Sequence, residues 1–281
     1  MSAVRAIAIV LAIAPMLFGG VRAYAQERVI EENLVVTDPT VAAPLHWLIG
    51  GAVEGWFSGT PWEPVFDKNR NQVGSSSFGY GQLGGNVTVG YDDLWAMLSY
   101  RTGSGQQTTD FSTGLKERSF QKETELELKL RYLLRGVEFF GTTPYLLVGY
   151  NNTHFDTPLT ILNPFNVFTV TQTPFLQRSI DYNQAFVGMG GIHPFNDRSG
   201  VRADLVLSGA SVVMTESNVL PGFANKFTGL GVGGRAHTTL YYKVTDNLVA
   251  SFGATAVGVV SPVYMYSYVG VYTNLGYNIR F

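Results

Sequence analysis

The chain has 281 residues, no cysteine and a formal net charge of −2 at pH 7. The absence of cysteine excludes disulfide bonds and thiolate metal sites, and the basic residues are not clustered, which argues against nucleic acid as a partner. Charged residues form only 14% of the chain, whereas glycine and aromatic residues are abundant. This composition suits a soluble all-β protein or a transmembrane barrel, since no stretch after residue 25 is apolar enough for a spanning helix.

The first 25 residues have the order of a secretory signal peptide. Arg5 precedes an apolar run from residue 6 to residue 18, and Ala23 and Ala25 supply the small residues of a signal-peptidase site. The run is too short and wrongly flanked for a membrane anchor. We therefore expect export to the periplasm, cleavage near Ala25 and a periplasmic N-terminal lead segment, without a clear strand, over residues 26–45.

Alternating side chains dominate the rest of the chain. Between residues 123 and 134 the even positions 126, 128 and 130 are leucine, and the odd positions carry charges. Because side chains alternate across a strand, this segment has one apolar and one charged face. The same period predicts ten strands, at 46–58, 77–91, 94–103, 118–134, 139–152, 179–194, 199–214, 228–244, 247–260 and 264–281. Residues 46–281 thus predict an antiparallel up-and-down β-barrel of about ten strands, with eight or twelve as alternatives.

The predicted connections alternate in length. The links after the second, fourth, sixth and eighth strands are short, and those after the first, third, fifth and seventh are longer. Outer-membrane barrels have short periplasmic turns and longer external loops, whereas a soluble sandwich has no reason for this alternation. Aromatic residues gather at the predicted periplasmic ends, as a membrane-interface girdle requires. They are Trp47, Tyr91, Tyr132, Phe139, Phe140, Phe195, Tyr241, Tyr242, Tyr277 and Phe281.

The C-terminal residues carry a more specific signal. Thr273, Leu275, Tyr277, Ile279 and Phe281 share one face of the last predicted strand. Together with the signal peptide and the alternating segments, this ending resembles the C-terminal signal of Gram-negative outer-membrane β-barrel proteins. The resemblance implies a barrel in the cell outer membrane, in contact with outer-membrane lipid and lipopolysaccharide. It also implies that the barrel-assembly machinery reads the assembly signal Leu275, Tyr277, Ile279 and Phe281. No single family within this class matches.

The inward faces predict a polar lumen. A ten-stranded barrel is only slightly wider than an eight-stranded one, whose side chains fill its interior, and this argues against a wide aqueous pore. Two interpretations remain open: the lumen charges form a paired plug, or they line a narrow porin-like passage for small solutes. The candidate pore-lining residues are Glu125, Glu127, Lys129, Arg131, Arg202, Asp204, Arg235 and His237, with Glu54, Arg101, Glu123, Lys243 and Arg280 also predicted to face inward.

The patterns of known barrel enzymes are absent from the sequence. Omptin-like proteases use an Asp pair and an Asp/His couple near the outer rim, but Asp92-Asp93 falls in a predicted periplasmic turn. Lipid-modifying barrel enzymes need a His-x-Ser couple, and no histidine here is followed by serine at that spacing. Four scattered histidines give no metal-ligand spacing. We therefore expect a non-enzymatic protein with no catalytic residue, cofactor or metal.

The longer loops are the second candidate for function, because loops carry binding on rigid scaffolds. The link 152–178 is unusually apolar for an external loop, and its residues 167–171 alternate. It is expected either to extend the neighbouring strands above the membrane or to fold into the barrel mouth. The first loop, 60–76, holds Trp62 and Phe66. Adhesion, surface contact or a structural role is therefore the alternative to a passage.

Overall fold

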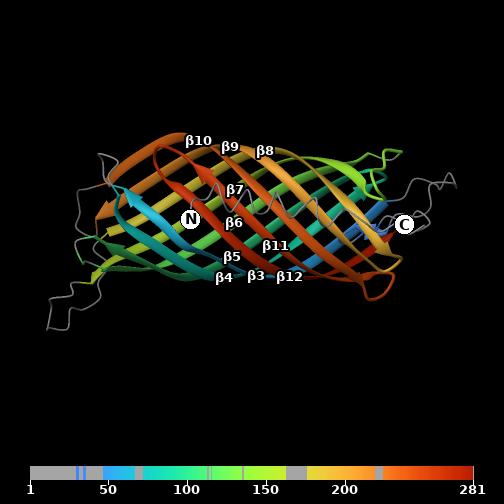
Figure 1. The fold of residues 1–281 in the computed structure, drawn as a ribbon, viewed down its shortest axis with the longest axis horizontal. Coiled ribbons are helices and arrows are strands. Elements are labelled where there is room, and N and C mark those ends of the chain that lie inside the picture. The colour runs from blue at the N-terminus through green and yellow to red at the C-terminus, as the bar shows by residue number, and fades with distance from the viewer. Residues whose placement is uncertain are drawn as a thin grey trace.

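The computed structural model describes residues 30–31, 34–35, 47–66, 72–112, 114, 116–134, 136–162, 176–218 and 224–280. Ten antiparallel strands, β3 to β12, form a closed barrel in which consecutive strands pair and β12 pairs back with β3 (Figure 1). The prediction of an all-β up-and-down barrel is confirmed, and the strand number is ten rather than eight or twelve. Among the described residues, no helix is long and apolar enough to cross a membrane.

Strands β3 to β10 extend beyond their predicted bounds at the end away from the short turns, whereas β11 and β12 keep about the predicted length. The strands are β3 (Trp47–Phe66), β4 (Gln72–Tyr91), β5 (Leu94–Phe111), β6 (Lys116–Leu133), β7 (Thr143–Leu162), β8 (Leu176–Asn196), β9 (Ser199–Asn218), β10 (Ala224–Lys243), β11 (Leu248–Val260) and β12 (Met265–Arg280). A separate antiparallel pair, β1 (Ile30–Glu31) and β2 (Leu34–Val35), lies in the predicted lead segment, so the expectation of no strand over residues 26–45 is wrong at these residues. The signal peptide, its cleavage site and the other lead residues fall outside the described residues.

Alternation decides which side chains enter the barrel. On β6, Leu128 is 47% exposed on the outer surface, whereas the adjacent Glu127 is 2% exposed inside. Successive side chains of a strand point to opposite faces, so the leucines coat the barrel and the charges fill it. Over the length that β11 and β12 reach, closing the sheet also pairs the backbone of each strand with a neighbour on both sides. That pairing is the condition for crossing a lipid layer.

One end of the barrel, called here the turn end, carries the short connections and both ends of the barrel chain, Trp47 and Arg280. Two-residue turns join β4 to β5 and β8 to β9. Asp92 has a φ of 49°, as tight hairpin turns require. The β6–β7 link is longer than predicted, because β7 begins at Thr143 rather than at residue 139.

Aromatic side chains surround the turn end, as predicted. Tyr241 is the exception: it is 2% exposed because it points into the lumen, and its neighbour Tyr242 takes the outward position. Phe281 lies outside the described residues. The exposed members are Trp47, Tyr91, Tyr132, Phe139, Phe140, Phe195, Tyr242 and Tyr277.

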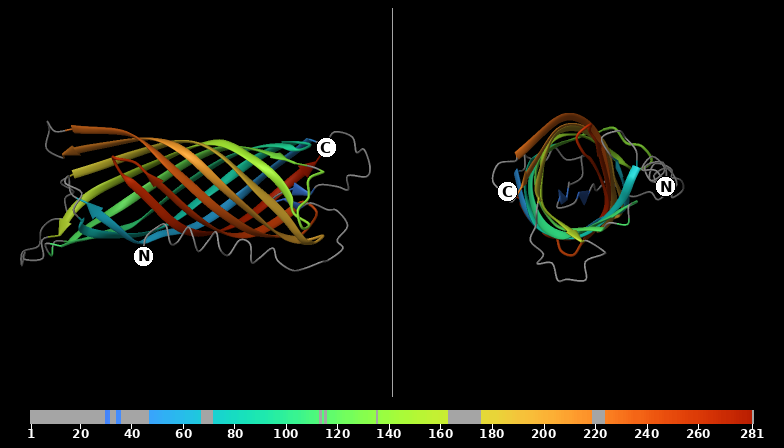
Figure 2. Two further views of the ribbon diagram at one scale, coloured as in Figure 1. Left: turned by 45° about the horizontal axis from the view of Figure 1, so that its top comes forward. Right: turned by 90° about the vertical axis from the view of Figure 1, so that its left-hand side faces the viewer.

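The outer surface changes from apolar to polar about halfway along the strands. On β5 the outward residues are Leu94, Ala96, Leu98 and Tyr100, followed by Thr102, Ser104, Gln106, Thr108 and Asp110. We call the half of the strands next to the turn end the band, taken as the length of about 9–11 residues that a strand needs to cross a membrane. Strands β3 to β10 have 18 to 21 residues, so they continue beyond the band for roughly 30 Å at about 3.3 Å per residue. We call this continuation the extension (Figure 2).

Strands β11 and β12 do not take part in the extension. They have 13 and 16 residues and end well short of their neighbours (Figure 2). The turn between them, residues 261–264, leans inward, and Val263 and Tyr264 pack against the apolar side chains of the lumen. Space for this turn comes from β10, where a methyl group on Gly229 would lie 2.7 Å from Val263 Cγ2. The glycines of β10 therefore make room for a neighbouring hairpin.

Aromatic rings inside the barrel lie directly over glycines of adjacent strands. At five of these glycines, a methyl group would overlap the ring that covers the position. Covering a strand glycine with an aromatic ring fills the space that its missing side chain leaves. The abundance of both residue types thus has a packing reason. The pairs are Trp95 over Gly90, Phe186 over Gly149, Tyr145 over Gly190, Tyr241 over Gly200 and Tyr272 over Gly253.

Candidate functional site

The lumen is filled at three successive levels. A charged layer lies in the middle, between two apolar clusters. The turn-end cluster consists of Leu48, Trp95, Leu133, Tyr145, Leu147, Phe186, Ile192, Val206, Tyr241 and Val249. The aromatic cluster, toward the extension, consists of Phe155, Ile180, Tyr182, Ala210, Val212, Val259, Tyr266 and Tyr268.

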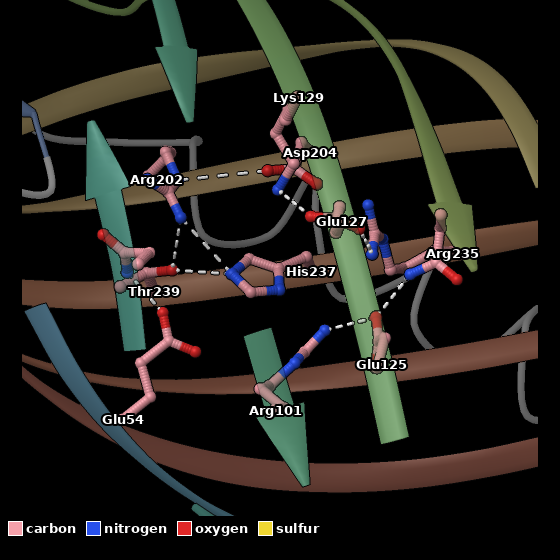
Figure 3. Close-up of polar contacts among 12 residues, drawn as sticks. Glu54, Arg101, Glu125, Glu127, Lys129, Arg202, Asp204, Arg235, His237 and Thr239 are labelled. Carbon is pink, nitrogen blue, oxygen red and sulfur yellow. Dashed lines mark hydrogen bonds and ion pairs between the residues drawn. The ribbon is translucent and has the colours of Figure 1, made fainter. Parts of the chain in front are cut away.

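Glu127 is the centre of the charged layer. It accepts a hydrogen bond from Arg235 Nη1 and contacts Lys129 Nζ at 2.9 Å. Glu127 lies on β6 and Arg235 on β10, so this ion pair crosses the lumen between strands that are not neighbours (Figure 3). A carboxylate that is 2% exposed requires such partners, because an unpaired charge away from water is very costly. The bridge therefore joins two walls of the barrel.

A second ion pair joins the neighbouring strands β5 and β6. Arg101 Nη2 lies 2.5 Å from Glu125 Oε1, and Asn151 Nδ2 donates to the same oxygen. The Arg101 guanidinium is also 4.1 Å from the centre of the Trp56 ring. Such a cation–π contact adds about 2 kcal/mol when the cation is desolvated. The carboxylate and the ring thus stabilise the Arg101 charge from two sides.

His237 belongs to a cluster of hydroxyl groups. Its Nε2 atom lies 2.7 Å from Tyr272 Oη and 3.0 Å from Thr239 Oγ1. Arg202 Nη2 donates to Thr239 Oγ1 at 3.2 Å. The Tyr272 ring stacks on Trp56 with 4.3 Å between ring centres. These contacts hold His237 as one member of a buried network.

The remaining acids of the layer also have polar partners. Asp204 accepts a hydrogen bond from Tyr145 Oη at 3.2 Å. Glu54 accepts one from Trp56 Nε1 at 2.9 Å and another from Asn86. The acids inside the barrel at this level are Glu54, Glu123, Glu125, Glu127 and Asp204, and the bases are Arg101, Lys129, Arg131, Arg202 and Arg235. Five acids face five bases, so the formal charges cancel apart from any charge on His237, and a balanced set costs less to bury.

All eight predicted lumen residues lie inside the barrel. Arg235 and His237 are partly buried, and the other six are at most 8% exposed. The structure brings Glu127, Lys129 and Arg235 together, and separately Arg202, Asp204 and His237. A pore-lining role for them stays a prediction. Of the assembly signal, Leu275, Tyr277 and Ile279 point outward from β12, each just over half exposed, and Phe281 lies outside the described residues.

Little free space is left between the charged layer and the aromatic cluster. A cavity of about 20 Å³ lies there, lined in part by Glu125, Asn151, Phe186, Arg235 and Tyr266. A cavity needs about 10–15 Å³ to hold one water molecule. This cavity therefore accommodates a single water molecule.

The structure also contains a pair that sequence spacing did not indicate. His154 Nδ1 lies 2.7 Å from Asp181 Oδ1 on the outer surface of the extension, on strands β7 and β8. The next strand, β6, places Thr124 opposite His154. The strand register is needed to place Thr124, His154 and Asp181 side by side, because the three residues are far apart in sequence. No group of three or more acids and histidines able to hold a metal occurs among the described residues.

The fold resembles that of solved bacterial outer-membrane barrels. The outer membrane protease OmpT from Escherichia coli matches with a TM-score of 0.57 and 9% identity over 85% of this chain and 98% of that one. The translocator domain of the autotransporter NalP from Neisseria meningitidis matches with a TM-score of 0.44 and 11% identity, over 84% and 88% of the two chains. The Pseudomonas putida toluene transporter TodX matches with a TM-score of 0.28 and 10% identity, over 84% of this chain and 90% of that one.

Comparison of the sequence with known protein families and proteins does not identify a family for this chain. No protein-family model matches the chain, and no curated protein matches it. At 9% identity the match to OmpT supports the fold and leaves the activity open. The fold is that of an outer-membrane β-barrel, as the C-terminal residues indicated.

Proposed function

We propose that this protein is a non-enzymatic surface-contact barrel of the outer membrane, whose sealed lumen is structural and whose extension does the binding. One observation carries the proposal. Within the band, the strands enclose a lumen that is filled with paired charges. Beyond the band, the same strands continue with polar outward side chains. A barrel built only to conduct would need a continuous polar lumen, and one built only to anchor would not need strands of twice the spanning length.

The outer surface of the extension supports binding because its side chains hold one another in place. On β7 and β8, His154 bonds Asp181, and Asn152 Nδ2 donates to Asn183 Oδ1 at 2.9 Å. Such cross-strand pairs stiffen a sheet surface. A surface that is already ordered loses less conformational entropy when a partner binds. The extension thus offers a rigid polar wall.

A narrow passage for small solutes is the second candidate, and the charged layer favours it. Intramembrane charges often mark a solute path. Passage would require the Glu127–Arg235 bridge to open and both apolar clusters to separate. Surface contact needs no such rearrangement, and we therefore favour it over a passage.

Trimming the extension tests the surface-contact proposal. In the test variant, residues 157–178 are replaced by Asn-Gly, which closes a two-residue hairpin at the paired residues Asp156 and Ser179. The same variant carries serine in place of Asn152, His154, Asp181 and Asn183, which removes both cross-strand pairs of the wall. A Gram-negative host that displays the full barrel is expected to attach to cells or coated surfaces. A host that displays the trimmed barrel should attach no more than the host alone. Equal attachment by both, with both proteins folded in the membrane, would assign the contact to another part of the chain.

A further inference from the structure

The extension has a gap in its wall where β11 and β12 stop. The last residue of β10 that pairs with β11 is Val232, and the last residue of β3 that pairs with β12 is Gly59. Above these points β10 pairs only with β9, and β3 only with β4. Two strand edges therefore face the same gap, which is the width of the two missing strands, roughly 10 Å at 4.8 Å per strand.

The register shows which backbone groups of β10 face the gap. Lys243 N donates to Arg198 O on the β9 side, and Val244 N donates to Leu248 O on the β11 side. Backbone groups alternate sides along a strand, and the pairing of β10 with β9 has no register shift. The N–H and C=O groups of Lys226, Thr228 and Leu230 therefore point into the gap, where no described strand pairs with them.

The two edges differ in how well they are protected against pairing. The upper part of β3 contains Pro61 and Pro64, which have no N–H to donate, and its pairing with β4 is irregular between Thr60 and Glu63. Proline and bulges are the usual means by which an edge strand is kept from pairing with other chains. The β10 edge, residues 224–231, has neither. Lys226 is the one charged residue on this edge, so the edge is open to a segment that complements that charge, whereas the β3 edge is closed to pairing.

We propose that the β10 edge at Lys226, Thr228 and Leu230 binds an extended segment of another polypeptide, which adds to the barrel wall as a strand. The inference rests on the proposed surface-contact function and names its partner class. Backbone hydrogen bonds supply affinity in this mode, and alternate side chains supply selectivity.

The side chains of the edge define the segment that fits. Lys226, Thr228 and Leu230 point outward, and Leu230 is 81% exposed. Opposite charges and apolar pairs stabilise neighbouring strands. The bound segment should therefore carry a carboxylate opposite Lys226 and an apolar side chain opposite Leu230.

A second copy of the chain fits this edge poorly. Both copies would cross the membrane in the same direction, so two β10 edges would meet parallel to one another. The strand of a second copy that runs antiparallel to β10 is β3, whose edge carries the prolines. Parallel pairing is the weaker kind, so a separate polypeptide is the better occupant.

Amide hydrogen exchange tests whether the edge is open. In the full mature chain in detergent micelles, the Thr228 amide is expected to exchange much faster than those of Phe227 and Gly229, which bond to β9. Equal protection of the three amides would mean that the edge is covered, and would overturn the proposal.

Binding of a designed peptide tests whether the open edge accepts a strand. The probe is a fluorescent eight-residue peptide that alternates threonine and valine and carries one glutamate; the control peptide has N-methyl groups on alternate residues. Anisotropy should show binding of the probe and not of its N-methylated form. Thr228→Pro, which removes one N–H that faces the gap, should weaken binding by about tenfold, as the loss of one hydrogen bond allows. Thr228→Val keeps the N–H and should bind normally.

The outcomes separate this proposal from the function on which it rests. No binding of the probe to the folded barrel, or binding that is unchanged by Thr228→Pro and by N-methylation, overturns strand addition. If attachment of the displaying host still depends on residues 157–178, surface contact through the extension survives that failure. If the trimmed barrel, which lacks both cross-strand pairs of the β7–β8 wall, still supports attachment but Thr228→Pro abolishes it, the β10 edge is the contact and the β7–β8 wall is not.

Discussion

Replacing Glu127 by glutamine is expected to lower the free energy of unfolding of the barrel by about 3–5 kcal/mol, the usual cost of breaking a buried ion pair from one side. The neutral amide would leave Arg235 and Lys129 without the carboxylate that bonds both of them in the lumen. Urea unfolding of the refolded mature chain in lipid, followed by tryptophan fluorescence, measures the change.

Two further variants make the Glu127 result specific. Glu138→Gln, the same substitution at an exposed residue of the β6–β7 link, should change stability by less than 0.5 kcal/mol, as surface substitutions usually do (about ±0.5). Arg235→Gln combined with Glu127→Gln should cost less than the sum of the two single changes, because the residues are in contact. Additive effects would show that the bridge across the lumen does not form.

Replacing Gly190 by alanine is expected to destabilise the barrel by about 1–3 kcal/mol, the range for overpacking a filled interior. The added methyl group would overlap the Tyr145 ring and lie 2.5 Å from the carbonyl oxygen of Ala203. Tyr145 is fully buried in the turn-end cluster and donates to Asp204, so it has no free space to move into.

Gly209→Ala is the matched control for this change, since nothing lies within 4 Å of the methyl position there. The same unfolding measurement should place Gly209→Ala within error of the unchanged protein or slightly above it, because alanine restricts the unfolded chain. If Gly190→Ala were as stable as the control, the ring would not cover the glycine as described.

The residues that could be predicted from sequence are those whose position depends on alternation alone. The leucines and acids of β6 needed only the two-residue period of a strand, and Asp92-Asp93 needed only the turn preference of aspartate. The upper ends of the strands could not be found in this way. On β5, Gln106 and Thr108 continue the alternation, but both faces are polar there, and the period carries no hydrophobic signal.

Contacts across the lumen could not be predicted from sequence for a different reason. Alternation shows that Glu127 and Arg235 both face inward, but their meeting depends on how far each strand is shifted around the closed barrel. Tyr241 is a different case. It stands at an alternate position from Arg235 on the same strand, so alternation places it in the lumen, and its assignment to the girdle followed composition instead of alternation. The glycines of β10 suit the tight packing of a closed barrel, but sequence alone could not show that Gly229 and Gly231 make room for the hairpin turn at 261–264.

Single-channel recording of the refolded mature chain in a planar bilayer tests most directly whether the lumen is sealed. No discrete openings are expected, because the charged layer lies between two apolar clusters, and the cavity between the layer and the aromatic cluster holds about one water molecule. The Glu127→Gln variant should be recorded beside it under the same conditions. Openings of the unchanged protein, with an ion selectivity that shifts in the Glu127→Gln variant, would contradict a sealed lumen and make the charged layer the filter of a passage.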